Sequence, residues 1–216
     1  MLRVTKFLLS LLFGISMAVS AAPADDLDAG IAAIQHEWAR IHYQLPKDQQ
    51  DAAFVKLEAQ ADALDKAYAT RAEPKIWKAI VLSTHAGVSG GLGALSKVKA
   101  ARDLLIAAEK IDATALNGSI YTSLGSLYYQ VPGWPIGFGD DEKAEALLKK
   151  ALALNPDGID PNYFYGDFLQ RQGRSAEALT ALEKAMHAPA RPGREDADVG
   201  RRQEIQALIA DIKAKS

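Results

Sequence analysis

Cysteine is absent from the sequence. The chain therefore has no disulfide bond, no thiolate ligand for a metal and no cysteine nucleophile, so its stability has to come from packing. The same absence excludes attachment of a lipid to a cysteine at the end of a cleaved leader segment. Runs of β-branched residues are missing too, which argues against a sheet-forming chain.

An excess of positive charge is also missing. The full chain has 25 basic and 27 acidic side chains, and without Arg3 and Lys6 of the leader segment 23 basic side chains remain. This balance gives no electrostatic attraction towards nucleic acid or an anionic bilayer. We therefore expect no nucleic-acid partner.

The longest apolar run lies close to the N-terminus. Residues 7–19 are apolar apart from three small residues, and Arg3 and Lys6 precede them. Because a bilayer span needs ~20 residues, this run is typical of a secretory signal rather than of a retained anchor, which is the alternative. Val19 and Ala21 suit the −3 and −1 positions of a cleavage site. We predict a signal peptide over residues 1–21, cleaved after about Ala21, a periplasmic protein in a Gram-negative host, and no stable membrane insertion after cleavage.

Alanine and leucine dominate the rest of the chain, and glycine and proline gather between segments. This composition predicts an all-α fold with helices of ~10–20 residues. The expected helices cover residues 26–44, 48–71, 74–86, 95–111, 116–130, 140–154, 160–172, 175–187 and 196–214.

The clearest internal pattern lies in residues 118–156. Its spaced positions are Tyr121, Leu124, Gly125 and Tyr128 on a first helix, Ala144, Leu148 and Ala151 on a second, and Pro156 after its end. Small residues at Gly125 and Ala144 allow two antiparallel helices to approach each other. Leu148 and the larger residues of the first helix then fill the seam between them.

The same spacing occurs twice more. In residues 159–190 it is carried by Tyr165, Gly166 and Leu169, then by Ala178, Leu182 and Ala185. The upstream copy has Trp77, Ile80 and Thr84, then Ala101, Leu105 and Ala108. In the upstream copy Val81 stands where the other copies have glycine.

This spacing resembles the tetratricopeptide-repeat (TPR) superfamily, whose pattern W-x2-L-G-x2-Y precedes A-x3-F, with tyrosine here for tryptophan and leucine for phenylalanine. The resemblance covers residues 75–190. It implies an all-α, TPR-like solenoid of antiparallel helix pairs with about three repeats. It also implies a scaffold that binds a protein or peptide partner without catalysis.

The segments that flank the repeats are predicted to cap them within a single domain over residues 22–216. Residues 26–71 form an N-terminal helical hairpin, or a degenerate fourth repeat, since Trp38 fits the first-helix spacing whereas Phe54 breaks the second. Residues 196–214 form a C-terminal capping helix. This helix is expected to bury Val199, Ile205, Leu208, Ile209 and Ile212 and to expose Arg201, Arg202, Lys213 and Lys215.

Two repeats are longer than the third at the turn between their helices. Nine positions separate Leu169 from Ala178, but sixteen separate Tyr128 from Ala144. We expect two enlarged loops on one edge, a glycine-rich one over 85–93 and an aromatic one over 131–140. The partner-binding candidates on this loop edge are His85, Gly87, Gly90, Gly91, Trp134, Ile136 and Phe138. The alternatives are a plain glycine hinge and aromatic side chains that fold back as loop core.

A second candidate surface is the concave groove, which the first helix of each repeat lines. Its partner-binding candidates are Lys75, Lys78, Tyr129, Tyr163, Asp167 and Arg171. The repeat alignment adds Leu82, His85, Ser119, Thr122, Ser126, Asp160 and Gln170 to this groove. The groove would run from basic to acidic and could orient a peptide, although solvated helix faces are the alternative.

Catalytic motifs are not found. The histidines, His36, His42, His85 and His187, form no pair at the spacing of a zinc protease. The glycine-rich segment lacks the lysine of a phosphate-binding loop, and no G-x-S-x-G elbow occurs. We expect no catalytic residue, no metal site and no cofactor.

The leading hypothesis is therefore a periplasmic adaptor or scaffold. The alternative is an accessory subunit of a small-ligand uptake system, because the chain is similar to the TPR component of tripartite periplasmic (TRAP-type) transporters. Repeat architecture, the export signal and the G-D-D-E-K-A start of the 140–154 helix carry this similarity. The chain departs from that family by lacking a lipidation cysteine.

Overall fold

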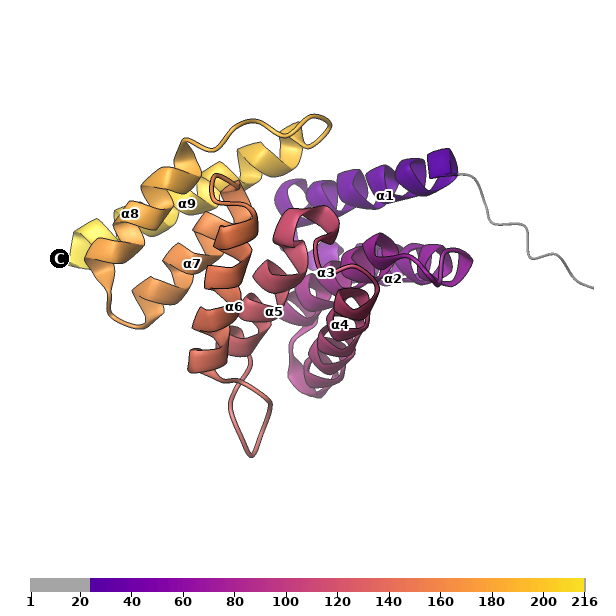
Figure 1. Ribbon diagram of the computed structural model, residues 1–216, viewed down its shortest axis with the longest axis horizontal. Helices are drawn as coiled ribbons and strands as arrows, with labels where there is room; N and C mark the ends of the chain where they lie inside the picture. The colour runs from indigo at the N-terminus through magenta and orange to yellow at the C-terminus, as the bar shows by residue number, and fades with distance from the viewer. Residues whose placement is uncertain (1–23, 216) are drawn as a thin grey trace, which may run out of the picture.

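The structure, a computed structural model, describes residues 24–215, and all of its regular secondary structure in that range is helical (Figure 1). The predicted signal peptide lies outside the described residues. Every expected helix is present to within about one turn, the usual uncertainty of such boundaries. The elements are α1 (Ala24–Ala39), a π-helical turn η1 (Arg40–Gln44), α2 (Lys47–Ala67), α3 (Ala72–Ser89), α4 (Gly91–Ile111), a 3-10 turn η2 (Ala115–Gly118), α5 (Ser119–Gln130), α6 (Asp141–Leu154), α7 (Ile159–Arg171), α8 (Ser175–Met186) and α9 (Glu195–Lys215).

Consecutive helices pack as antiparallel pairs, α3 with α4, α5 with α6 and α7 with α8. The first helices of neighbouring pairs also contact each other, so that α5 lies between α3 and α7. The predicted solenoid of helix pairs is confirmed. No helix among residues 24–215 is both long and apolar enough to cross a bilayer.

The glycine of the repeat pattern is required where two helices touch. A Cβ atom on Gly125 would lie 2.7 Å from Leu148, and one on Gly166 would lie 2.7 Å from Leu182. These distances are shorter than side chains tolerate, so glycine is what allows each pair to close. The predicted repeat register is confirmed by this equivalence.

The expected glycine loop over 85–93 does not exist. Helix α3 continues to Ser89, α4 begins at Gly91, and the turn between them is made at Gly90 (φ 60°) and Gly91 (φ 66°). Ionic contacts hold both sides of this turn, because Glu58 of α2 accepts hydrogen bonds from His85 of α3 (2.6 Å) and Lys97 of α4 (2.7 Å). Tertiary packing therefore overrides the weak helix propensity of the glycines.

Helix α9 presents a different face from the expected one. Val199 is 58% exposed, whereas Arg201 is only 7% exposed. The reason is that Arg201 pairs with Asp160 of α7, at 2.8 Å, which turns this face of α9 inwards. The expected burial of Val199 and exposure of Arg201 are wrong.

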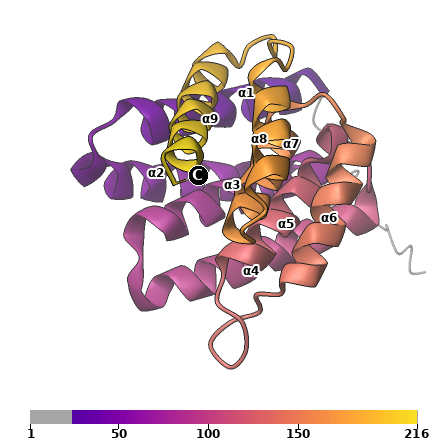
Figure 2. The same ribbon diagram turned by 90° about the vertical axis from the view of Figure 1, so that its left-hand side faces the viewer.

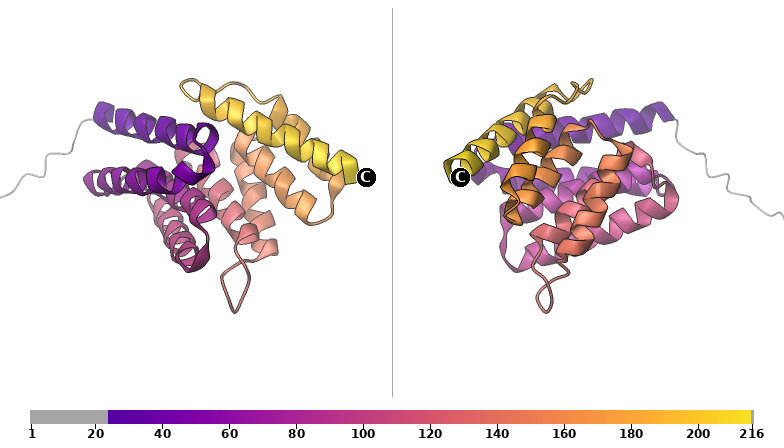
Figure 3. Two further views of the ribbon diagram at one scale, coloured as in Figure 1. Left: turned by 180° about the vertical axis from the view of Figure 1, so that it is seen from behind. Right: turned by 60° about the vertical axis from the view of Figure 1, so that its left-hand side comes forward.

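The two ends of the described chain meet. Helix α9 contacts both α1 and η1, and the ribbon views show α1 and α9 beside each other across the mouth of the solenoid (Figures 2 and 3). His42 Nε2 and the Tyr43 hydroxyl lie 3.3 and 3.2 Å from the carboxylate of Glu204. The first and last helices of the described chain therefore border the concave side of the repeats, which stays partly open.

Candidate functional site

A cavity of about 450 Å³ occupies the concave side of the solenoid. Helices α1, α3, α5 and α7 supply its walls, together with the start of α9 and the segment 189–194 before it. Its lining combines hydroxyl and amide side chains, two tryptophans and three arginines. The residues used below are Trp38, Trp77, Thr84, Leu116, Asn117, Ser119, Thr122, Ser123, Ser126, Asp160, Arg191, Arg194 and Arg201.

The wall from α5 is made of small hydroxyl residues. Ser119, Thr122, Ser123 and Ser126 recur at the spacing that puts side chains on one face of a helix. Three of them donate hydrogen bonds to carbonyl groups of their own chain segment, at 2.7 to 3.3 Å. Their small size leaves space in front of α5, and their oxygen lone pairs remain available to accept hydrogen bonds from a ligand.

The corner between α4 and α5 has unusual backbone geometry. Leu116 and Asn117 both have φ of 51°, and Gly118 follows with φ of 83°. The left-handed conformation costs a residue with a side chain ~1–2 kcal/mol. This turn places Leu116 and Asn117 on the cavity wall, next to the hydroxyl face of α5. A strained backbone conformation persists only where the surrounding packing fixes it, and such conformations are often found at binding sites.

Two tryptophans form the opposite wall. Their ring centroids are 6.4 Å apart, in an edge-to-face arrangement. Trp38 Nε1 donates to the Thr84 hydroxyl at 2.9 Å. Trp77 is 4% exposed, and its Nε1 has no hydrogen-bond partner within residues 24–215.

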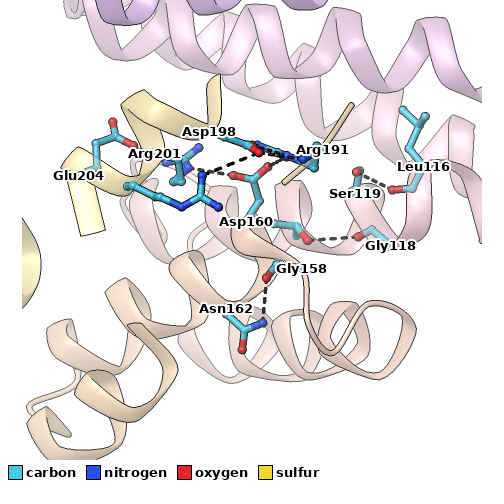
Figure 4. A network of polar contacts seen from close by, with 12 residues as sticks. Leu116, Gly118, Ser119, Gly158, Asp160, Asn162, Arg191, Asp198, Arg201 and Glu204 are labelled. Carbon is cyan, nitrogen blue, oxygen red and sulfur yellow. Dashed lines mark hydrogen bonds and ion pairs between the residues drawn. The ribbon is translucent and has the colours of Figure 1, made fainter. Parts of the chain in front are cut away.

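A network of charged residues closes the C-terminal side of the cavity (Figure 4). Asp160 accepts hydrogen bonds from Arg191 at 2.6 Å and from Arg201 at 2.8 Å. Arg191 also pairs with Asp198, and Arg201 with Glu204. Burial alone would raise the pKa of Asp160, but the two guanidinium groups outweigh it and hold that pKa well below its usual range.

Arg194 stands apart from this network. Its guanidinium carbon lies 4.9 Å from the centre of the Trp77 ring. Among residues 24–215 its side chain makes no ion pair or hydrogen bond, and its Nε atom is buried without a partner. Burial, together with the neighbouring charge of Arg191, lowers the pKa of Arg194 to about 10, although the carboxylates of Asp160 and Asp198 oppose this shift. Arg194 therefore interacts with the charges of the network at longer range, without a direct ion pair.

Some of the groove positions from the repeat alignment line this cavity. Ser119, Thr122, Ser126 and Asp160 do so. The predicted basic end of the groove does not, because Lys75 pairs with Asp65 at 2.7 Å and Lys78 with Asp62 at 2.7 Å. Both carboxylates come from α2, which lies against this part of α3. The expected basic end of the groove is therefore wrong, and the three arginines at the C-terminal side lie beside three carboxylates, those of Asp160, Asp198 and Glu204.

The remaining predicted groove residues connect repeats. The Tyr129 hydroxyl donates to Asp167 of α7 at 2.7 Å, and the Arg171 guanidinium lies 5.1 Å from the Tyr129 ring. Burial and the carboxylate of Asp167 raise the pKa of Tyr129. Tyr163 lies beneath the guanidinium of Arg201, at 4.3 Å. None of these residues lines the cavity, so the structure gives them a role in joining α5, α7 and α9.

The predicted loop edge divides into exposed and buried residues. Trp134 is 90% and Ile136 is 66% exposed, whereas Phe138 packs 5.4 Å from the Tyr128 ring and beneath Arg102. His85 is 2% exposed, and its ring nitrogens face Glu58 and Asp51, so it offers no surface to a partner. The exposure expected of His85 is wrong. Gly87, Gly90 and Gly91 are exposed at the turn between α3 and α4. Partner binding by the exposed residues of this edge stays a prediction.

The reasoning from sequence missed Trp38, Arg191 and Arg194 as cavity residues. Arg191 and Arg194 lie between the predicted helices 175–187 and 196–214, in a segment for which no site was predicted. The available signal was the presence of two arginines so close together in this short segment.

Comparison with known proteins supports the repeat assignment. Residues 136–192 match the family model described as "Tetratricopeptide repeat". No curated protein sequence matches the chain. A thermophilic TPR protein of Thermus thermophilus, known from its crystal structure, is 18% identical and superimposes with a TM-score of 0.56 over 86% of this chain and 92% of that chain. At this identity the likeness concerns the fold alone, and it confirms the predicted TPR-like solenoid.

Proposed function

We propose that this chain is a non-catalytic scaffold that holds a segment of a partner protein in the cavity on the concave side of its solenoid. The observation that carries the proposal is the cavity itself, which every repeat contributes to and which helices α1 and α9 border. Concave surfaces are where helical repeat proteins commonly bind extended partners. TPR proteins in general bind other proteins, and the repeat match supports this role here.

The chemistry of the walls supports a peptide as the occupant. Hydroxyl and amide groups on α5 and η2 can form hydrogen bonds with the backbone of a peptide. The rings of the two tryptophans offer a rigid apolar surface against which its side chains can pack. A volume of about 450 Å³ falls within the ~300–1,000 Å³ typical of ligand sites. It would hold a short stretch of chain rather than a folded domain.

Site-specific photo-crosslinking tests this proposal in cells. A photoreactive residue at Ser123, which lines the cavity, should crosslink to a partner protein. The matched control places the same residue at Gln60, an exposed position on α2. A melting curve for each variant checks that both are folded. Crosslinks from Gln60 and none from folded Ser123 variants would show that partners bind elsewhere.

The proposal also places the protein in the periplasm. The leader-like residues 1–21 and the lack of cysteine support this location. Cell fractionation followed by N-terminal sequencing should find a mature chain that starts near Ala22. An uncleaved chain in the cytoplasm would contradict the location without affecting the cavity.

The enclosure of the cavity favours a second candidate function, the handling of a small ligand beside a solute-binding protein, as in TRAP-type uptake systems. A site that both chain ends cover suits a small molecule better than an open groove does. Native mass spectrometry of protein purified without refolding separates the candidates. A bound compound of a few hundred daltons supports the second, and crosslinks from Ser123 to a protein support the first.

A further inference from the structure

The loop over residues 131–140 has a tip, residues 133–136, whose apolar side chains the rest of the chain leaves uncovered. Trp134 and Ile136 are the most exposed large apolar residues of the described chain, and no charged residue occurs between 131 and 139. The other exposed large apolar side chains among residues 24–215 lie singly on separate helices, namely Val55, Ile111, Leu154 and Val199. Single exposed apolar residues are ordinary, whereas neighbouring ones indicate a contact site.

The loop is held in one shape before any contact is made. The N–H of Gly137 donates to the carbonyl of Gly133 at 3.0 Å, across the tip. The N–H of Gly139 donates to the carbonyl of Pro132 at 3.0 Å, across the base. The ring of Phe138 anchors this base between α5 and α4. A preorganised loop loses little conformational entropy on binding, so more of its contact energy appears as affinity.

The cavity on the concave side suits an uncharged occupant. Arg191 contacts Asp160 and Asp198. Arg201 contacts Asp160 and Glu204. With the third arginine of this side, three positive charges stand beside three negative ones, so the charges balance without a ligand. An uncharged segment leaves this balance undisturbed, whereas a charged one would bring an unpaired charge into a partly enclosed site.

The walls of the cavity complement the loop tip. Trp38 and Trp77 supply apolar contact for the side chains of the tip. Within residues 24–215 the carbonyl groups of Trp134 and Ile136 accept no hydrogen bond, and the hydroxyl of Ser123 on the cavity wall can donate one. A volume of about 450 Å³ is large enough for a tryptophan side chain and the backbone on either side of it.

The loop and the cavity lie apart in one copy of the chain. The loop follows the C-terminal end of α5 and projects away from α1 and from the segment before α9, which both border the cavity (Figures 1 and 2). Trp134 therefore stays exposed in a single copy and reaches a cavity of this kind only in another copy.

We propose that the loop over residues 131–140 of one copy inserts Trp134 into the concave cavity of a second copy. This inference rests on the proposed function, because it names the chain and the segment that the cavity holds. The two surfaces differ, so the contact is heterologous and leaves one loop and one cavity free for further copies. Because the tip buries less area than a standard interface, the association is weak and depends on concentration.

Sedimentation velocity of the purified protein tests the inference. The weight-average mass of the wild type should rise above that of the monomer as the concentration is raised to about 500 µM. Trp134→Ala should weaken the association at least about tenfold, and Ser123→Phe, which fills the cavity, should do the same. The matched control Val55→Ala shortens another exposed apolar side chain, on α2, and should associate like the wild type. A melting curve for each variant checks that it is folded.

A mixture of the two variants identifies the surfaces that meet. Trp134→Ala keeps a free cavity and Ser123→Phe keeps an intact loop. Together they should form a one-to-one dimer at concentrations where each variant alone is monomeric. Association of folded Ser123→Phe alone, as strong as that of the wild type, would mean that the loops pack outside the cavity and would overturn the inference. A mixture that stays monomeric while the wild type associates would overturn it as well.

Tryptophan emission gives a second readout. The chain contains three tryptophans, of which Trp38 and Trp77 are buried. A decrease in acrylamide quenching as the wild-type concentration rises therefore reports the burial of Trp134. A wild type that stays monomeric with unchanged quenching at about 500 µM would overturn the inference. A blue shift of that monomer's emission on phosphatidylcholine vesicles would then assign the loop to a bilayer instead.

Crosslinking from Ser123 in cells keeps this inference separate from the proposed function. A crosslink to a second copy supports both. A crosslink to a different protein, with a wild type that is monomeric in vitro, overturns the inference and leaves the scaffold function intact. Association in vitro that depends on Trp134 and Ser123, without any crosslink in cells, retains the contact between copies and overturns the scaffold function.

Discussion

The ring of Tyr43 lies directly against the backbone of Gly200, so closely that a Cβ atom at Gly200 would overlap it. This contact joins η1 near the start of the described chain to α9 at its end. Glu204, one turn further along α9, accepts a hydrogen bond from the Tyr43 hydroxyl. The cover of the cavity therefore depends on a glycine in a helix, where propensity alone would disfavour it.

Replacing Gly200 with alanine is expected to separate the chain ends. The added methyl group has no space beside Tyr43, and overpacking of this kind costs ~1–3 kcal/mol. Urea unfolding should show the loss, and hydrogen exchange in α1 and η1 should accelerate. The control Gly93→Ala adds a methyl group in α4, where nothing lies within 4 Å. Unchanged exchange in α1 for a folded Gly200→Ala protein would mean that this contact does not hold the cover.

A second pair of substitutions compares a glycine at a helix seam, Gly125, with a glycine on an open helix face, Gly87. Gly125→Ala should lower the free energy of unfolding by ~1–3 kcal/mol, because its Cβ would lie 2.7 Å from Leu148. Gly87→Ala should raise it by ~0.5–1 kcal/mol, since Gly87 lies within helix α3 with nothing within 4 Å. Chemical denaturation measures both. A stabilising Gly125→Ala would show that the seam between α5 and α6 is loose.

These glycines show what sequence can and cannot predict here. Gly125 and Gly166 occupy the same place in the pattern of the first helix, and Leu148 and Leu182 the same place in the pattern of the second, so the repeated patterns located the seams between helices. Gly90 and Gly91 carried no such relation and read as part of a flexible loop. The helices continue on both sides of that turn because Glu58, distant in sequence, holds them, and a contact of that kind leaves no local pattern.

The charged residues of the site were harder to predict for the same reason. The repeat alignment placed Lys75 and Lys78 in the groove, which would be correct for repeats without a neighbouring hairpin. Helix α2 packs against this part of α3 and supplies the carboxylates that pair with both lysines. Arg191 and Arg194 lie outside every repeat, so no alignment of the repeats with one another could place them at the cavity.

Trp134→Ala tests whether the exposed loop is a second contact surface. Because the side chain is 90% exposed, its removal should change the free energy of unfolding by less than ~0.5 kcal/mol. If the loop binds the partner, affinity should fall by ~2 kcal/mol or more, as expected for a central aromatic contact. Calorimetric unfolding and a pull-down measure the two quantities. An affinity equal to that of the wild type would remove the loop from the binding surface.

Asp160→Asn should destabilise the protein by ~3 kcal/mol at neutral pH, because it removes the negative charge that contacts both Arg191 and the buried Arg201. The folded-state pKa of Asp160 lies below its ordinary value of 3.8, so the stabilisation is fully present above that pH and is lost as pH falls below it. The difference between wild type and variant should therefore shrink as pH is lowered below about 4. Urea unfolding at several pH values measures it. A difference that is constant down to about pH 2 would mean that folding does not lower the pKa of Asp160.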